Sequence, residues 1–314
     1  MMKNTFTILS FCCSLFFTDG IQAQVYNYEP VRLANTETNP SYLASDKSGR
    51  LFSYQHNGSA YDPHHFYQDA IRCNYYNPSF FTGFGLVASH THVGDSASYT
   101  TLGAGLAYRT VLFNKVFLRL GAMYKQTWYQ GYGGRFTYYH FVSLAESAPV
   151  RKSMGNANLS FSMSSPGDKY FIAAGLLNYR LPSFKADTLL QLPSYAFITV
   201  GDFWKILGNS RINNELSYTC ILKRYPGQSS LQLSHYMNTV FRLLQLSRIQ
   251  QFRVGLRIGI TDDRYLQYTP ALSYYQKQDK GFFVAQIGLD MSYKVSGNTY
   301  PFTPVLQINI TRTF

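Results

Sequence analysis

The sequence predicts an all-β fold, an antiparallel transmembrane β-barrel of about 14 strands. Three observations lead to this prediction: apolar and polar residues alternate, the composition is unusual, and the last alternating segment ends on Phe314. Aromatic residues make up 17% of the chain and charged residues only 14%, whereas a globular domain carries about a quarter charged residues. This composition is unusual for a soluble enzyme and typical of a barrel with aromatic girdles at both membrane interfaces.

The alternation has a period of two and is clearest around Val254 and Leu256, which share an apolar face. Arg253, Gly255 and Arg257 share the opposite face. A two-layer sandwich would turn the apolar face toward a core, and a barrel would turn it toward lipid. Tyrosine or phenylalanine at the apolar-face ends of many such segments favours the barrel. The expected strands lie near residues 50–56, 66–76, 79–90, 99–109, 116–128, 156–164, 170–178, 194–204, 214–223, 230–241, 251–261, 264–275, 281–294 and 304–314.

The connections between these segments alternate between short and long. In an outer-membrane barrel the short turns face the periplasm and the long loops face outward. The alternation supports the barrel, although residues 261–264 are short where a long loop is due. Short turns rich in Pro, Gly, Asn and Asp lie at 77–78, 113–115, 165–168 and 278–281, and longer links at 57–65, 91–98, 129–155 and 179–193.

The N-terminus carries the pattern of a secretory signal peptide. Lys3 provides a positive charge, residues 6–17 form an apolar run too short to cross a bilayer, and Ala23 is a small residue at the cleavage edge. We therefore expect a signal peptide at 1–23, a periplasmic segment at 24–48 and a barrel at 49–314. The stretch before the first strand either remains periplasmic or folds into the barrel mouth.

The last strand is the strongest single indication of location. Leu306, Ile308, Ile310 and Phe314 share one face, and Arg312 departs from the pattern on that same lipid-facing side. A final alternating strand with a terminal aromatic residue resembles the sorting signal that the barrel insertion machinery reads. Phe314 is the expected insertion signal, and the outer membrane of a Gram-negative bacterium is the expected location.

The formal charge of +12 suggests which partners the chain meets. In an exported barrel, a positive excess points to lipopolysaccharide phosphates or an acidic partner rather than to nucleic acid. The mature region holds only Cys73 and Cys220, too few for a disulfide framework.

Residues suited to catalysis do not converge in the sequence. Ser234 and His235 are adjacent on an expected strand, so their side chains point to opposite faces. His90 and His92 share a face, but a metal site needs three or four converging ligands. No phosphate-binding Gly-Lys-Ser/Thr loop is present. We expect no enzyme activity, no cofactor and no metal.

The lumen is expected to carry positive charge. In a water-filled pore these residues would favour anionic solutes; in a filled barrel they would pair with Asp290, Glu215 and loop carboxylates. Glycines and tyrosines on the same faces favour the filled interior. The cationic residues on the expected polar faces are Arg109, Arg119, Lys125, Arg253, Arg257 and Lys294.

Two segments are candidates for contact with other proteins. The loop at 129–155 is rich in aromatic and basic residues, as protein-binding hot spots are. The alternative is that it extends two strands beyond the interfacial aromatic belt. The turn at residues 39–42 is the candidate for contact with a periplasmic partner. The candidate contact residues are Asn39, Pro40, Tyr42, Tyr132, Phe136, Tyr138, Tyr139 and Arg151.

Short motifs resemble those of the PorP/SprF family. Residues 39–44, Asn-Pro-Ser-Tyr-Leu-Ala, are similar to the Asn-Pro-Ala-Tyr-Ala-Gly signature near the mature N-terminus of that family. A Gly-x-Gly strand at 83–86, a loop Asp at 95 and an Ala-Tyr-Arg ending at 107–109 follow in similar order. Leu43 and Ser45 depart from the signature, and His56-Asn57 replaces a Gln-Trp type of ending.

The resemblance implies a specific role. Members of the family are outer-membrane proteins of Bacteroidota associated with type IX secretion and gliding motility. The expected partners are therefore type IX secretion components, a periplasmic peptidoglycan-binding protein, or a large secreted adhesin that the barrel helps to export or hold. The alternative is a porin-like or lipid-transport channel.

Overall fold

The computed structural model describes most of the barrel and a short segment that precedes it. No helix in the described part of the chain is long and apolar enough to cross a membrane. The described residues are 39–45, 50–59, 66–93, 97–112, 116–132, 134–137, 140–143, 149–165, 170–180, 194–205, 213–224, 231–247, 249–261, 265–278, 281–294 and 305–313. The expected signal peptide, Phe314, Tyr138 and Tyr139 lie outside these ranges.

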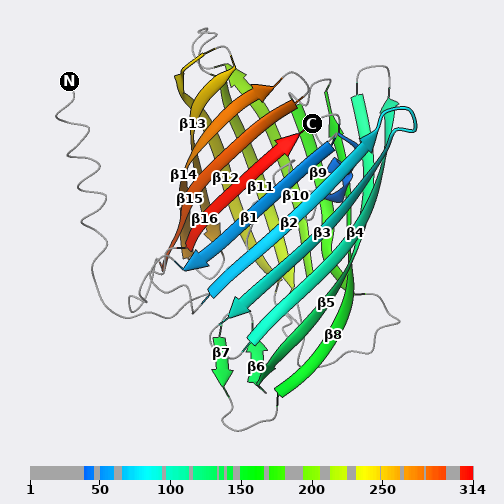
Figure 1. The fold of residues 1–314 in the computed structure, drawn as a ribbon, viewed down its shortest axis with the longest axis vertical. Coiled ribbons are helices and arrows are strands. Elements are labelled where there is room, and N and C mark those ends of the chain that lie inside the picture. The colour runs from blue at the N-terminus through cyan, green and yellow to red at the C-terminus, as the bar shows by residue number, and fades with distance from the viewer. Residues whose placement is uncertain are drawn as a thin grey trace, which may run out of the picture.

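Fourteen antiparallel strands form one closed barrel, which confirms the predicted fold class (Figure 1). Each barrel strand pairs with the next one along the chain, and β1 closes the ring by pairing with β16 from Leu51↔Thr313 to Ser59↔Val305. The barrel strands are β1 (Arg50–Ser59), β2 (Phe66–Asn77), β3 (Thr82–Val93), β4 (Ala97–Leu112), β5 (Val116–Tyr132), β8 (Pro149–Ser164), β9 (Tyr170–Arg180), β10 (Ser194–Lys205), β11 (Asn213–Arg224), β12 (Leu231–Gln245), β13 (Gln250–Thr261), β14 (Tyr265–Gln278), β15 (Gly281–Lys294) and β16 (Val305–Thr313).

All the expected strand segments are present, and several differ in their bounds. β3 begins at Thr82 rather than near residue 79, because residues 78–81 form the turn in which Phe81 has a φ of 52°. β5 continues to Tyr132 and β8 already begins at Pro149. Residues 129–132 and 149–155 of the expected loop therefore belong to these two strands. Between them, β6 (Gly134–Thr137) and β7 (His140–Ser143) form a separate hairpin. Figure 1 places this hairpin at the end of the barrel opposite the C-terminus.

The two faces of the wall follow the predicted alternation. Leu102, Leu120 and Ile258 point outward and are exposed, as an apolar outer wall requires. Arg119 and Arg257 on the intervening positions point inward and are buried. Arg312 lies on the outer face as expected and is exposed. Cys73 and Cys220 are not joined by a disulfide.

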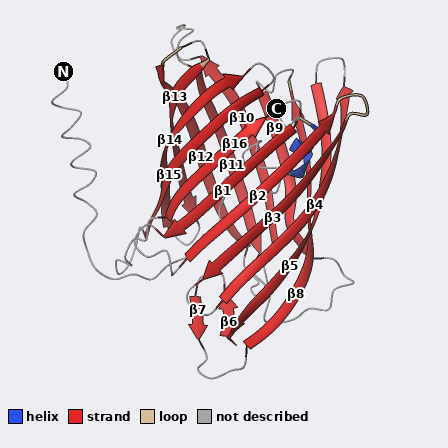
Figure 2. Cartoon of the chain, in the orientation of Figure 1, coloured by secondary structure: helices blue, strands red, loops and turns tan. Residues whose placement is uncertain are grey.

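A short 3-10 helix, η1 (Pro40–Ala44), is the helical element of the described chain (Figure 2). It packs against β2, β3, β4, β5 and β8 from within the ring. On β3 and β5 it meets the first residues of the strands, close to the short turns at 78–81 and 113–115. The described residues 39–45 of the expected N-terminal segment therefore lie inside the ring.

Candidate functional site: the occupied barrel interior

The segment from Asn39 to Ser45 is the most completely buried part of the described chain. Asn39, Ser41, Leu43 and Ala44 have no exposed surface, and Tyr42 retains only 4%. Proline at the first helical position suits a helix start, because its missing N–H would be unpaired there anyway. Asn39, Pro40 and Tyr42, the candidates for contact with a periplasmic partner, are therefore buried in this conformation, and that contact stays a prediction.

Glycines on the inner wall make room for η1. A side chain at Gly83 would overlap the main chain of Leu43, and one at Gly121 would overlap the main chain of Pro40 and Ser41. Gly85 and Gly105 leave space for the side chain of Leu43 in the same way. Only glycine allows the main chain of η1 to lie this close to the strands.

Serines on β8 fix η1 by hydrogen bonds. The backbone N–H of Ser41 donates to Ser160 Oγ at 2.8 Å. Ser41 Oγ is hydrogen-bonded to Asn39 Oδ1 at 2.6 Å and to Ser162 Oγ at 2.9 Å. Buried polar groups that are paired in this way fix one orientation, since leaving them unpaired is costly. The apolar side of the contact is a cluster of Leu43, Ala44, Tyr76, Val87, Ala107 and Met123.

We call the wall residues that contact η1, Gly83, Gly85, Gly105, Gly121, Ser160 and Ser162, the η1 seat. Two predicted lumen arginines lie beside it, directly opposite each other on β4 and β5. The Arg109 guanidinium lies between the rings of Tyr76 and Phe117, 4.8 Å from each centroid. Arg119 donates from Nη1 to Ser164 Oγ at 2.9 Å. Both side chains are buried, and aromatic faces attract a cation most strongly when it is shielded from water.

The opposite wall carries a polar network. Arg257 Nη2 lies 3.0 Å from Asp290 Oδ2, and Thr269 Oγ1 donates to Asp290 Oδ1 at 2.9 Å. The pairing of Arg257 with Asp290 is one that the filled interior predicted. Arg253 stacks over the Tyr275 ring at 4.1 Å. Lys125 is buried on the inner face, and the side chains of Lys294 and Glu215 lie outside the described part.

An apolar cluster covers the inner wall between β9 and β12. It consists of Ala173, Leu177, Phe197, Ile221 and Tyr236. Gly259 leaves room for the Tyr236 ring, because a side chain there would overlap it. The described inner wall therefore carries packed side chains and η1, and it combines an apolar surface with buried cations.

Residues considered for catalysis do not form a site. Ser234 points inward and is buried, while His235 points outward and contacts the Tyr218 hydroxyl at 2.6 Å. His90 and His92 share the outer face, as predicted, where Tyr67 stacks on His92. In the described ranges, no three His, Cys, Asp or Glu residues lie close enough to hold a metal ion.

The loop residues expected to bind a partner are placed only in part. Tyr132 ends β5 and Phe136 lies in the β6–β7 hairpin opposite Phe141. Arg151 is exposed on β8, where it pairs in register with Gln130. The alternative of a strand extension therefore accounts for Tyr132 and Arg151, and the hairpin is a feature that the sequence did not predict.

The seat of η1 was also missed at the level of single residues. Its glycines and serines fall within the expected strands at 79–90, 99–109, 116–128 and 156–164, for which no contact with the N-terminal segment was predicted. The available signal was the row of small residues on the inner faces of β3, β4 and β8. Such a row leaves space that some other segment of the chain has to fill.

Comparisons with known proteins identify the fold. No protein-family model and no curated protein matches the sequence. Among solved structures, the CymD monoaromatic hydrocarbon channel is similar with a TM-score of 0.54 at 8% identity, over 93% of this chain and 95% of that one. A Pseudomonas aeruginosa FadL homologue is similar with a TM-score of 0.52 at 10% identity, over 93% and 95%. A mutant of the TodX monoaromatic hydrocarbon channel gives 0.50 at 11%, over 87% and 91%. The chain has the fold of an outer-membrane β-barrel.

Proposed function

We propose that this protein is an outer-membrane channel for small solutes, closed by its own N-terminal segment in the conformation described here. The observation that carries the proposal is the seating of η1 inside the ring on Gly83, Gly121 and Ser160. A segment held by short polar contacts and close packing, with no covalent bond to the wall, can leave its seat without breaking the barrel. The similarity in fold to hydrocarbon channels supports the channel over a purely structural barrel.

The lining favours solutes that carry both an apolar body and a negative charge. The cluster around Phe197 and Tyr236 offers an apolar surface. Buried Arg109, Arg119 and Lys125 offer positive charge. An anionic group is attracted to such an excess of cations, and the effect is strong where water is excluded.

Planar-bilayer conductance tests this proposal. Removing residues 40–44, or changing Gly121→Ala so that the new methyl group overlaps Pro40, should convert a mostly closed protein into one with steady, anion-selective currents. Gly255→Ala is the matched control, because its new methyl group meets only ordinary contacts. Carboxylates of increasing alkyl length should block the current progressively. A variant that lacks residues 40–44, folds and carries no current would contradict the channel.

A second candidate function is an accessory role in type IX secretion, the role that the PorP/SprF resemblance implies. One observation favours it. The residues that resemble the family signature, 39–44, include the whole of η1, and all five η1 residues are buried. Affinity purification from solubilised membranes tests it directly. Co-purification of a secretion component, a peptidoglycan-binding protein or a large adhesin is the expected result, and recovery of none of them would count against this role.

A further inference from the structure

The outer wall of the barrel has a groove of about 710 Å³ over β4, β5, β8, β9 and β10. Its sides are outward-pointing large residues, among them Leu120 at 55% and Leu176 at 44% exposure. Its floor is low because Ala122, Ala174 and Ala196 take the outward positions where other strands carry leucine or isoleucine. The volume lies in the range of about 300–1,000 Å³ that is typical of small-molecule sites.

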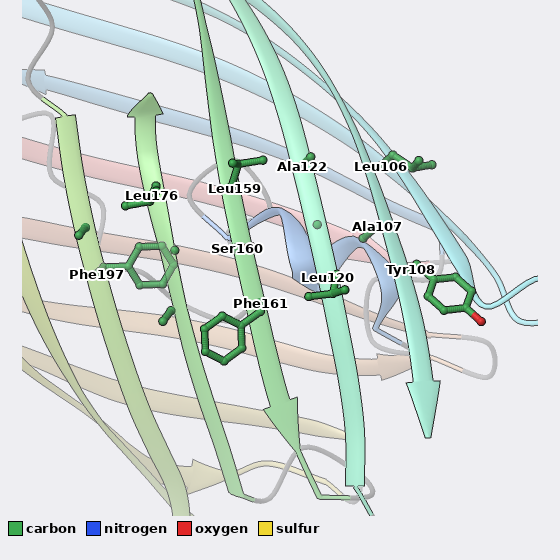
Figure 3. Close-up of a pocket in the computed structure, with 14 residues that line it drawn as sticks. Leu106, Ala107, Tyr108, Leu120, Ala122, Leu159, Ser160, Phe161, Leu176 and Phe197 are labelled. Atoms are coloured by element: carbon green, nitrogen blue, oxygen red, sulfur yellow. The ribbon is translucent and has the colours of Figure 1, made fainter. Parts of the chain in front are cut away.

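The floor of the groove is the other side of the η1 seat. Gly121 and Ser160 line the groove from the strand main chain and contact Ser41 on the inner face. Figure 3 shows η1 as the pale blue coil behind β5 and β8, with Leu120, Ala122 and Phe161 in front of it. The floor of the groove is therefore supported from the inner side by the packing of η1.

The chemistry of the lining selects a hydrocarbon. Among the described residues that line the groove none is charged, and the Tyr108 hydroxyl is their one outward-facing polar side-chain group. A peptide laid in this groove would leave its N–H and C=O groups without partners in a lipid environment, at a cost of several kcal/mol each. An alkyl chain has no such groups to satisfy.

We propose that this groove binds one acyl chain of a membrane phospholipid. On β4, β5 and β8 the lining residues lie in the half of each strand nearer the short turns, the half expected to face the periplasmic leaflet, where phospholipid resides. The chain lies across Ala122 and Ala174, between Leu120, Phe161 and Leu176. The inference depends on the membrane location proposed above and is independent of whether solutes pass through the lumen.

Photolabelling tests the site. The full-length protein is placed in nanodiscs with phosphatidylcholine that carries a diazirine in mid-chain, irradiated, and mapped by mass spectrometry. We expect adducts to be enriched several-fold at Leu120, Phe161 and Leu176 over Ile258, Leu272 and Ile287, which are outward-facing and exposed over a similar range on the other side of the barrel. Equal labelling of the groove residues and the three control residues would contradict the lipid site, but not the membrane location of the barrel. Absence of adducts from both faces would overturn the site and the membrane location together.

Substitutions that fill the groove with a larger side chain test the same site. Ala174→Phe places a ring on the floor of the groove. Labelling of the groove residues should then fall to the level found at Ile258, Leu272 and Ile287. Ala88→Phe adds the same ring at an outward position on β3, away from the groove, and should leave the labelling unchanged. Ala122→Leu is the second filling variant in case Ala174→Phe does not fold, which circular dichroism reports. Unchanged groove labelling in a folded filling variant would overturn the proposal.

Discussion

Ser41 and Ser160 are 119 residues apart in the sequence, and a 2.8 Å hydrogen bond joins them inside the barrel. The donor is a main-chain N–H of η1 and the acceptor is a hydroxyl of β8. This bond ties the segment that enters the barrel to the wall that surrounds it. The wall residues that contact η1 therefore set where this segment lies inside the ring.

Removing the acceptor should loosen η1. Ser160→Ala deletes the acceptor of the Ser41 N–H. The free energy that holds η1 in place should fall by about 1 kcal/mol, which raises the ratio of displaced to bound η1 roughly fivefold. Hydrogen exchange of residues 39–45 measures this as faster exchange. Ser273→Ala is the control, since Ser273 contacts the Arg253 carbonyl on the far wall. Equal exchange in the two variants would contradict the role of Ser160.

The glycines of the seat should differ in their tolerance of a methyl group. Gly83→Ala meets the main chain of Leu43, which cannot move aside, and should cost about 1–3 kcal/mol. Gly105→Ala meets the ends of the Leu43 and Met123 side chains, which can rotate, and should cost less. Denaturant unfolding in lipid vesicles, with hydrogen exchange of residues 39–45 alongside, measures both effects. The reverse order would show that the main chain of η1 does not rest on β3.

The strands could be predicted from the sequence because their signal is local. Period-two alternation around Val254 and Leu256 sets both the strand and its two faces within a few residues. The seat of η1 could not be predicted in this way, because Gly83 and Gly121 meet residues 40–43 only after β2 to β5 have paired. A glycine on an inner face shows that space is needed, but its sequence neighbours do not show what fills it.

The groove was hidden from the sequence for a related reason. Ala122, Ala174 and Ala196 are unremarkable one at a time, because single alanines are common on outer faces. Their effect depends on the registers of β8, β9 and β10, where Leu159 pairs with Leu176 and Leu176 pairs with Ala196. A register shift near Leu159 adds to the local alignment, and no periodicity in the sequence encodes that shift.

The buried ion pair should be more sensitive to the loss of one partner than to the loss of both. Asp290→Asn removes the carboxylate that pairs with Arg257, a residue only 4% exposed, and should destabilise the barrel by about 3–5 kcal/mol. Changing both residues, Arg257→Met with Asp290→Leu, removes the charges together and should cost less. Denaturant unfolding midpoints of the three proteins measure the order. A double variant weaker than Asp290→Asn would contradict this account.

The cost of a charge on the outer wall should depend on its depth. Leu106 is half exposed near the middle of β4, six residues from the level of His90, so Leu106→Arg places a cation near the hydrocarbon midplane and should cost about 2–4 kcal/mol. His90 lies on the same outer face near the long-loop end of β3, and His90→Arg should cost about 0–1 kcal/mol. Unfolding from lipid vesicles measures both free energies. Equal costs would place both positions at the same depth and contradict a membrane-spanning wall, because an arginine near the end of a strand reaches the headgroups and one at its centre does not.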